Sequence, residues 1–197
     1  MRKINQFKKY SISSTVIVIL IAAITFLDQL TKYIVKTNMQ LGQQIPVLGD
    51  FFKLTYIENP GMAFGIRFGN ANLFLALSFF AAVLVFYYLY RLRNEGWLIQ
   101  VALSFISAGA IGNIVDRFMY GRVIDFLDFE FFNIIVPAFN IFGVQFSGYQ
   151  MYRWPVFNVA DMAVSTGMII LIIYLIFIGD PLKQTPDTAT VSDEQSS

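Results

Sequence analysis

Residues 10–27 of the chain read YSISSTVIVILIAAITFL and contain no charged side chain. An uninterrupted apolar stretch of this length is long enough to cross the hydrocarbon core of a bilayer as a helix. It follows a basic N-terminal segment and ends at Asp28, and no small-residue cleavage site comes after it. We therefore predict a retained membrane-spanning helix here rather than a removable secretory leader.

Three further stretches without charge occur along the chain, at Phe68–Tyr90, Gly96–Val115 and Met162–Gly179. The 197 residues are 56% hydrophobic and only 14% charged, whereas about a quarter of the residues of a soluble domain are charged. We predict an all-α membrane protein with four transmembrane helices in one domain, residues 1–179. The spans are expected at about 10–28, 69–90, 96–116 and 158–179.

Two long loops connect these spans. Residues 51–57 in the first loop are rich in aromatic and β-branched residues and lie between turn signals, which predicts a small β-rich loop. The second loop, Phe118 to Pro155, is unusually aromatic and suits the lipid headgroup boundary. Asp128 and Glu130 within it are expected to be solvated loop charges. The polar tail, residues 180–197, is expected to be disordered and cytoplasmic.

The positive charges indicate the orientation in the membrane. Lys and Arg are concentrated in the short N-terminal segment and in the short link between the second and third spans. The remaining ones are spread over the two long loops and the tail. Short segments rich in positive charge stay in the cytoplasm, so we predict that both termini are cytoplasmic and both long loops face outward.

Two residue types are absent, and their absence limits the chemistry. The chain has no Cys and no His. Thiol nucleophiles, disulfides, Ser-His pairs and the usual zinc sites are therefore excluded. The net charge of +1 gives no bias toward nucleic acid. Any catalysis must use Asp, Glu, Lys, Ser, Thr or Tyr, and we expect neither metal nor cofactor.

Carboxylates gather at one predicted bilayer face. Asp28 ends the first span, Asp116 ends the third and Asp161 begins the fourth, while Asp125 lies nine residues beyond Asp116. Ionisable groups at membrane depth are costly and by default suggest a function. Other polar and small residues share helical faces with these carboxylates. They are Lys32 with Asp28, Gly109 and Asn113 with Asp116, and Asn158 with Asp161.

Such a cluster can hydrolyse an amide without histidine, cysteine or metal. Two adjacent carboxylates cannot both ionise, so they share one proton. The ionised member can then take a proton from water while the protonated member hydrogen-bonds the scissile carbonyl. We expect Asp161 to be one member and either Asp116 or Asp125 to be the other. Lys32 or Arg117 would keep Asp116 ionised, which favours Asp125.

Two other classes of protein have carboxylates in membrane helices. A small transporter or channel component would use them to bind protons or cations. Its charges would be expected along a path and its sequence in inverted repeats, whereas these charges share one face and no repeat is found. A non-catalytic assembly factor would use the aromatic loop to bind a partner.

Five segments of the chain, in order, resemble the lipoprotein signal peptidase (signal peptidase II) family of bacterial membrane aspartyl endopeptidases. They are Asp28-Gln29-Leu30-Thr31-Lys32, Glu58-Asn59-Pro60-Gly61-Met62-Ala63-Phe64-Gly65, Gly109-Ala110-Ile111-Gly112-Asn113-Ile114-Val115-Asp116-Arg117, Gly121-Arg122-Val123-Ile124-Asp125-Phe126 and Phe157-Asn158-Val159-Ala160-Asp161. The resemblance implies removal of the signal peptide from prolipoproteins by cleavage before a cysteine that carries diacylglycerol. It also implies inhibition by cyclic peptide antibiotics, and we expect a monomer in the inner membrane.

The resemblance further assigns roles to residues. It implies that Asp125 and Asp161 are the catalytic pair. It implies a supporting or substrate-binding role for Asp28, Lys32, Asn59, Gly109, Asn113, Asp116, Arg117 and Asn158. Residues Phe52 to Asn59, predicted as a strand, would hold the substrate extended beside this site.

The chain departs from the family pattern between the two catalytic candidates. The connection is longer than the family pattern leads us to expect, with an insertion within about residues 131–154. Pro137-Ala138-Phe139-Asn140 in this insertion resembles the beginning of the last family segment. Phe142-Gly143 follows where Ala-Asp is required, so we assign that segment to Asn158 and Asp161 instead.

Overall fold

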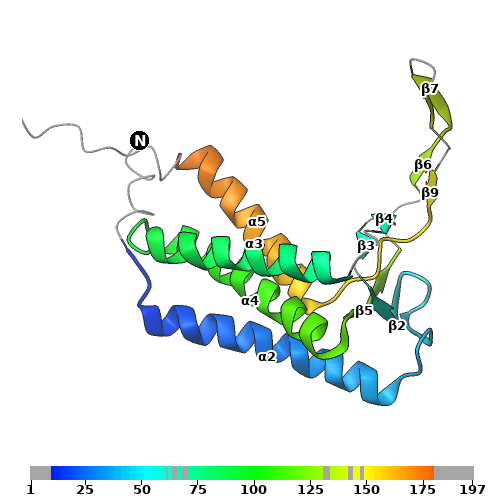
Figure 1. Ribbon diagram of the computed structural model, residues 1–197, viewed down its shortest axis with the longest axis horizontal. Helices are drawn as coiled ribbons and strands as arrows, with labels where there is room; N and C mark the ends of the chain where they lie inside the picture. Colours follow the sequence, from blue (N-terminus) through cyan, green and yellow to red (C-terminus); the bar gives the residue numbers. More distant parts are fainter. Residues whose placement is uncertain are drawn as a thin grey trace, which may run out of the picture.

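Four long helices form the body of the protein (Figure 1). They are α2 (Ser14–Asn38), α3 (Ala71–Arg91), α4 (Trp97–Tyr120) and α5 (Val159–Phe177). The computed structural model describes residues 10–60, 62–63, 66–67, 71–130, 134–141, 144–146 and 149–179. The basic N-terminal segment and the tail expected to be disordered lie outside these residues.

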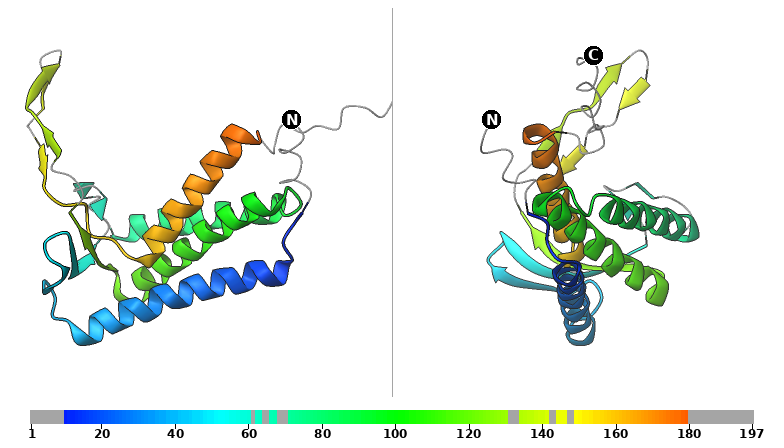
Figure 2. Two further views of the ribbon diagram at one scale, coloured as in Figure 1. Left: turned by 180° about the vertical axis from the view of Figure 1, so that it is seen from behind. Right: turned by 90° about the vertical axis from the view of Figure 1, so that its left-hand side faces the viewer.

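Helix α4 is the centre of the bundle, because it contacts each of the other three helices (Figure 2). Its buried surface includes small residues such as Ala102, Ser104 and Ala108. The outer surfaces of the bundle are strongly apolar, with Phe26, Phe79 and many other large side chains exposed. Such a surface suits hydrocarbon and not water.

Three of these helices, α2, α4 and α5, are long and apolar enough to cross a membrane. In α3 the apolar part that the structure describes, Leu75–Arg91, is shorter. The chain is thus a multi-pass membrane protein, and a spanning role for α3 stays a prediction.

Helices α2 and α4 continue beyond the apolar runs that predicted them. Helix α2 extends ten residues past Asp28, and α4 extends four residues past Asp116 to Tyr120. The next residue, Gly121, has a φ of 69° in the left-handed region and ends α4. A charged residue ends an apolar run without interrupting backbone hydrogen bonds. Asp28 and Asp116 therefore lie within helices and not at their ends.

Glycines allow α4 and α5 to approach closely. A Cβ atom on Gly109 would collide with the carbonyl oxygen of Ala160, and one on Gly167 would lie 2.6 Å from the carbonyl oxygen of Ala102. A Cβ on Gly112 would collide with the carboxylate of Asp28. Small residues at such crossings bring helix backbones together in membranes.

A small sheet covers one end of the bundle. Strands β1 (Gln44–Leu48), β2 (Phe52–Asn59) and β5 (Val123–Phe129) form an antiparallel sheet in the order β1–β2–β5. A further short ladder joins β3 (Met62–Ala63) and β4 (Ile66–Arg67). The β-rich loop predicted from residues 51–57 is thus confirmed.

The position of β2 limits the ways in which it could hold a substrate, a role that stays a prediction. It pairs with β1 on one side and with β5 on the other. A central strand has no free edge to which a substrate could be added, so β2 cannot hold an extended peptide by backbone pairing. The sequence identified the strand but carried no information about its neighbours.

The second loop is also more buried than expected. Phe126 on β5 packs in a core with Val35, Met39, Tyr56 and Ile124, so it is not a headgroup contact. The prediction that Asp128 is a solvated charge is wrong, because only 2% of this residue is exposed.

Asp128 is buried because it has specific partners. Thr55 Oγ1 donates to Asp128 Oδ2 at 2.5 Å, and Arg153 Nε lies 2.7 Å from Asp128 Oδ1. Arg153 Nη1 also reaches Glu130 Oε2 at 2.9 Å, and this carboxylate remains partly exposed. Arg153 therefore neutralises two carboxylates that lie more than twenty residues before it in the sequence.

The described part of the insertion forms two short antiparallel ladders, which we call the arm and define as residues 134–141, 144–146 and 149–151. Its inner ladder pairs β6 (Ile134–Val136) with β9 (Tyr149–Met151). Its outer ladder pairs β7 (Phe139–Ile141) with β8 (Val144–Phe146). The Pro137-to-Asn140 segment that resembles a family motif lies in this arm, away from the bundle (Figure 1).

The close approach of α4 and α5 gives a first prediction. We expect Gly109→Ala to lower the free energy of unfolding by about 1–3 kcal/mol, because the added methyl group must displace the α5 backbone. Thermal unfolding in detergent micelles measures this change. Ala22→Val adds carbon at an exposed position of α2 and should leave the midpoint nearly unchanged. Equal midpoints for Gly109→Ala and the native chain would contradict the packing described here.

Candidate active site

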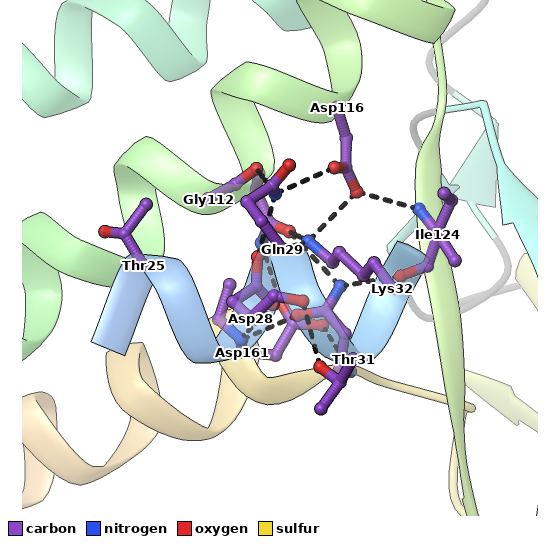
Figure 3. A network of polar contacts seen from close by, with 12 residues as sticks. Thr25, Asp28, Gln29, Thr31, Lys32, Gly112, Asp116, Ile124 and Asp161 are labelled. Atoms are coloured by element: carbon purple, nitrogen blue, oxygen red, sulfur yellow. Dashed lines mark hydrogen bonds and ion pairs between the residues drawn. The ribbon is translucent and has the colours of Figure 1, made fainter. Parts of the chain in front are cut away.

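A buried ion cluster lies at the end of the bundle nearest the sheet (Figure 3). Lys32 Nζ is 2.8 Å from Asp28 Oδ2 and 2.9 Å from Asp116 Oδ2. All three residues are almost completely buried. The predicted pairing of Asp28 with Lys32 is present. Two cations were considered as partners of Asp116, and the ion pair is made by Lys32.

Gln29 completes the cluster, although the sequence analysis gave it no role. Its Nε2 atom donates to Asp28 Oδ2 at 3.1 Å, to Asp116 Oδ1 at 3.0 Å and to the carbonyl oxygen of Gly112 at 3.1 Å. The only sequence signal was its position between Asp28 and Lys32 in the first family segment. The Gln29 side-chain amide therefore links α2 to α4 beside the charged side chains of both helices.

The cluster also fixes two backbone positions. Asp28 Oδ1 accepts a hydrogen bond from the backbone N–H of Ala160 at 2.8 Å, at the start of α5. Asp116 Oδ2 accepts one from the backbone N–H of Ile124 at 3.0 Å, on β5. Each of these residues immediately precedes one of the two catalytic candidates. The ion cluster therefore holds the backbone next to both Asp125 and Asp161.

Asp161 lies in the first turn of α5, within a capping box. Its backbone N–H donates to Asn158 Oδ1 at 2.9 Å, and its Oδ2 accepts from the backbone N–H of Asn158 at 3.3 Å. Asn113 Nδ2 donates to Asp161 Oδ1 at 2.8 Å. The helix N-terminus and these donors favour a negative charge on Asp161.

Asp125 lies on β5, opposite Ile57 of β2, and is 2% exposed. Asn158 Nδ2 donates to its Oδ1 at 2.7 Å, and Asn59 Nδ2 donates to its Oδ2 at 3.2 Å. Burial and the nearby charge of Asp161 raise the pKa of the Asp125 carboxyl from its usual value to about 7. Asp125 is thus suited to carry a proton near neutral pH.

Asn158 and Asn113 join these groups into one network. Asn158 contacts both aspartates, and its Nδ2 also donates to Asn113 Oδ1 at 3.2 Å. The same Asn113 oxygen accepts from Lys32 Nζ at 3.1 Å. The two amides thus connect the ion cluster to the pair of aspartates.

A cavity of about 560 Å³ opens beside this network. Both aspartates line it, together with Asn59, Asn113 and Arg117. Its other walls come from the start of β5, from α5 and from the segment that precedes α5. They are Val123, Trp154, Pro155, Val156, Phe157, Met162, Ser165 and Thr166. The sequence analysis did not find Ser165 and Thr166, because hydroxyls in an apolar helix give no distinctive signal.

The remaining predicted site residues have different positions. Arg117 Nη1 donates to the backbone oxygen of Asn113 at 3.4 Å, at the cavity wall. Gly109 is not in the wall and instead permits the approach of α5. Among the described residues, no group of three or more carboxylates lies close enough to hold a metal ion.

The family model described as signal peptidase (SPase) II matches residues 20–177. The chain belongs to the signal peptidase II family. The matched residues include the ion cluster, both aspartates and the cavity residues, so the whole site lies within the part of the chain that matches the family model.

Individual relatives agree with this assignment. The chain is similar to the lipoprotein signal peptidase of Syntrophus aciditrophicus, with 38% identity over 78% of this chain and 87% of that one. The lipoprotein signal peptidase of Staphylococcus aureus is 33% identical over 86% of this chain and 91% of that one. A solved bacterial membrane enzyme is similar with a TM-score of 0.70 and 29% identity, over 91% of this chain and 98% of that one.

The ion cluster gives a second prediction. We expect Lys32→Met to lower the free energy of unfolding by about 3–5 kcal/mol, because it leaves two buried carboxylates without a cation. Chemical or thermal unfolding in micelles measures the change. Lys53→Met is the matched control, since the partner of Lys53 is Asp50, whose side chain is 87% exposed, and a pair with a solvated partner should matter little. Similar effects of the two substitutions would refute the structural role of the cluster.

Proposed function

We propose that this signal peptidase II is an aspartic endopeptidase that removes the signal peptide from diacylglyceryl-modified prolipoproteins. In this proposal Asp125 and Asp161 are the catalytic pair, and cleavage occurs before the lipidated cysteine. The observation that carries it is that both carboxylates line one cavity and are connected by amide side chains, while burial raises the pKa of Asp125 to about 7. Family membership already identifies the chain as a protease.

The reaction begins with Asp125 protonated and Asp161 ionised. Asp125 donates a hydrogen bond to the scissile carbonyl oxygen, while Asp161 takes a proton from a water molecule that attacks the carbonyl carbon. The carbonyl oxygen receives the proton of Asp125, which gives a neutral gem-diol. Asp161 then protonates the amide nitrogen, the C–N bond breaks, and one gem-diol hydroxyl returns its proton to Asp125. Both carboxyl groups regain their initial states.

The surroundings of the two carboxylates support this division of roles. Asp161 accepts hydrogen bonds at the N-terminus of a helix, where a negative charge is favoured. Asp125 is buried on a strand and lies near the negative charge of Asp161. Both effects favour its protonated form. Lys32 is held by Asp28 and Asp116, and its charge therefore serves the ion cluster more than the pair.

We further propose that the protein lies in the bacterial cytoplasmic membrane with both termini inside and the cavity at the outer face. The positive N-terminal segment and the short positive link between α3 and α4 support this orientation. The signal helix of the substrate would then lie in lipid beside the bundle, and its acyl chains could remain in the bilayer. Family resemblance also suggests that cyclic peptide antibiotics bind this cavity, and we expect the enzyme to act as a monomer.

The catalytic pair gives a third prediction. We expect Asp125→Asn and Asp161→Asn each to lower the cleavage rate of a diacylglyceryl-modified prolipoprotein by at least about 10³-fold, because each removes a proton carrier. The size of the product on a gel measures cleavage by purified protein in detergent. Asp50→Asn is the matched control, because that carboxylate is exposed and does not line the cavity, and this variant should cleave normally. Full cleavage by either of the first two variants would eliminate the proposed pair.

The raised pKa gives a fourth prediction, on pH dependence. Because Asp125 must be protonated and has a pKa of about 7, the rate should fall as the pH rises above about 7, by about tenfold per pH unit. Initial rates at saturating substrate from about pH 6 to about pH 9 test this limb. A rate that stays constant across this range would contradict the assignment of the acid to Asp125.

A further inference from the structure

The arm is anchored where it leaves the sheet, at Glu130 and Arg153, which we call the root, whereas its two ladders extend away from the bundle. Glu130 precedes the arm and Arg153 follows it, and their ion pair of 2.9 Å closes the root. Arg153 Nη1 also donates to the backbone oxygen of Asp50 at 2.8 Å, and Arg153 Nε reaches Asp128. The root is therefore fixed to the three-stranded sheet. Among the described residues, neither arm ladder packs extensively against the helices or that sheet.

The composition of the insertion is unusual for a segment exposed to water. Residues 131–152 contain no Asp, Glu, Lys or Arg, and most are aliphatic or aromatic. Ile135 and Tyr152 are each 58% exposed. A two-stranded hairpin without further support is only marginally stable in water, so the arm needs a surface that covers it.

The register divides the outer ladder into two unlike faces. Directly paired residues share a face of an antiparallel ladder, and neighbours along a strand alternate between faces. The pairs Phe139 with Phe146 and Ile141 with Val144 occupy positions on one face. The pair Asn140 with Gln145 occupies the other. One face of the outer ladder is thus apolar in sequence and the other carries only uncharged amides.

We propose that the arm lies along the lipid surface, with its apolar face in the boundary between headgroups and acyl chains. The arm leaves the bundle at the end that carries the cavity and runs crosswise to α2, α3 and α4 in both views (Figures 1 and 2). Since α2 and α4 are long and apolar enough to cross the bilayer, a segment crosswise to them at their end runs parallel to the membrane surface. Amphipathic segments without charge bind there through apolar burial alone.

The neighbouring protein surface is also apolar, as expected for this placement of the arm. The arm extends on the side of the bundle where α5 lies (Figure 1). Helix α5 exposes large apolar residues along its length, including Met162, Ile169 and Ile176. Trp154 and Pro155, which follow the arm root, line the cavity. The segment that follows the arm thus reaches the cavity wall, and the arm extends on the same side as the apolar surface of α5.

Measurement of depth in a bilayer tests this inference. The native chain has no cysteine, so single nitroxide labels can be attached to Asn140→Cys and Ile141→Cys without removing other thiols. Ala22→Cys on the exposed surface of α2 and Asp50→Cys at the sheet edge give reference values for hydrocarbon and water. Accessibility to oxygen and to a nickel chelate is compared in phosphatidylcholine vesicles, with the unfolding midpoint checked for each labelled protein.

We expect the label at residue 141 to have an oxygen-to-nickel ratio severalfold higher than the label at residue 140, and between the two references. Addition of phosphatidylglycerol should leave these ratios unchanged, because the arm has no charge. Ratios at both arm positions equal to that of Asp50→Cys would overturn the inference, since the arm would then lie in water. Spin–spin broadening between copies without oxygen enrichment would also overturn it, in favour of a second copy as the covering surface.

Discussion

The fold depends on the burial of one ammonium group between two carboxylates. Charges out of water are tolerated only when they are paired and hydrogen-bonded. Lys32 meets Asp28 on its own helix and Asp116 on α4, and Gln29 provides further hydrogen bonds to both carboxylates. The two carboxylates also accept hydrogen bonds from backbone N–H groups of α5 and β5. Four separate elements are therefore aligned by a single neutralised cluster.

The aspartates at the cavity have a different environment. The ion cluster receives a cation, whereas Asp125 and Asp161 receive mainly amide donors from Asn59, Asn113 and Asn158. Amides orient a carboxylate without fixing its charge as strongly as an adjacent cation would. The protein thus separates carboxylates that are paired with a cation from carboxylates that are held by amides. This difference arises because Lys32 lies one helical turn after Asp28, where it pairs with Asp28 and Asp116.

Sequence alone predicted the features that depend on local order. Charge-free runs located the helices, and the four-residue spacing indicated the Asp28–Lys32 pair. Helix ends were missed because backbone hydrogen bonds continue through Asp28 and Asp116. The burial of Asp128 was missed because its partners, Thr55 and Arg153, are distant in sequence. The central position of β2 and the contribution of Thr166 to the cavity likewise depend on tertiary neighbours.

The pairing of β2 on both sides has a consequence for selectivity. In the part of the chain that the structure describes, β5 is also engaged on its outer side, where Phe157 bonds to the backbone of Leu127. The cavity therefore presents amide and carboxylate side chains and apolar walls, and no free edge of β2 or β5. Backbone pairing at a strand edge is indifferent to side chains, whereas contact with such walls depends on them. The shape and polarity of the walls would then decide which peptide sequences fit.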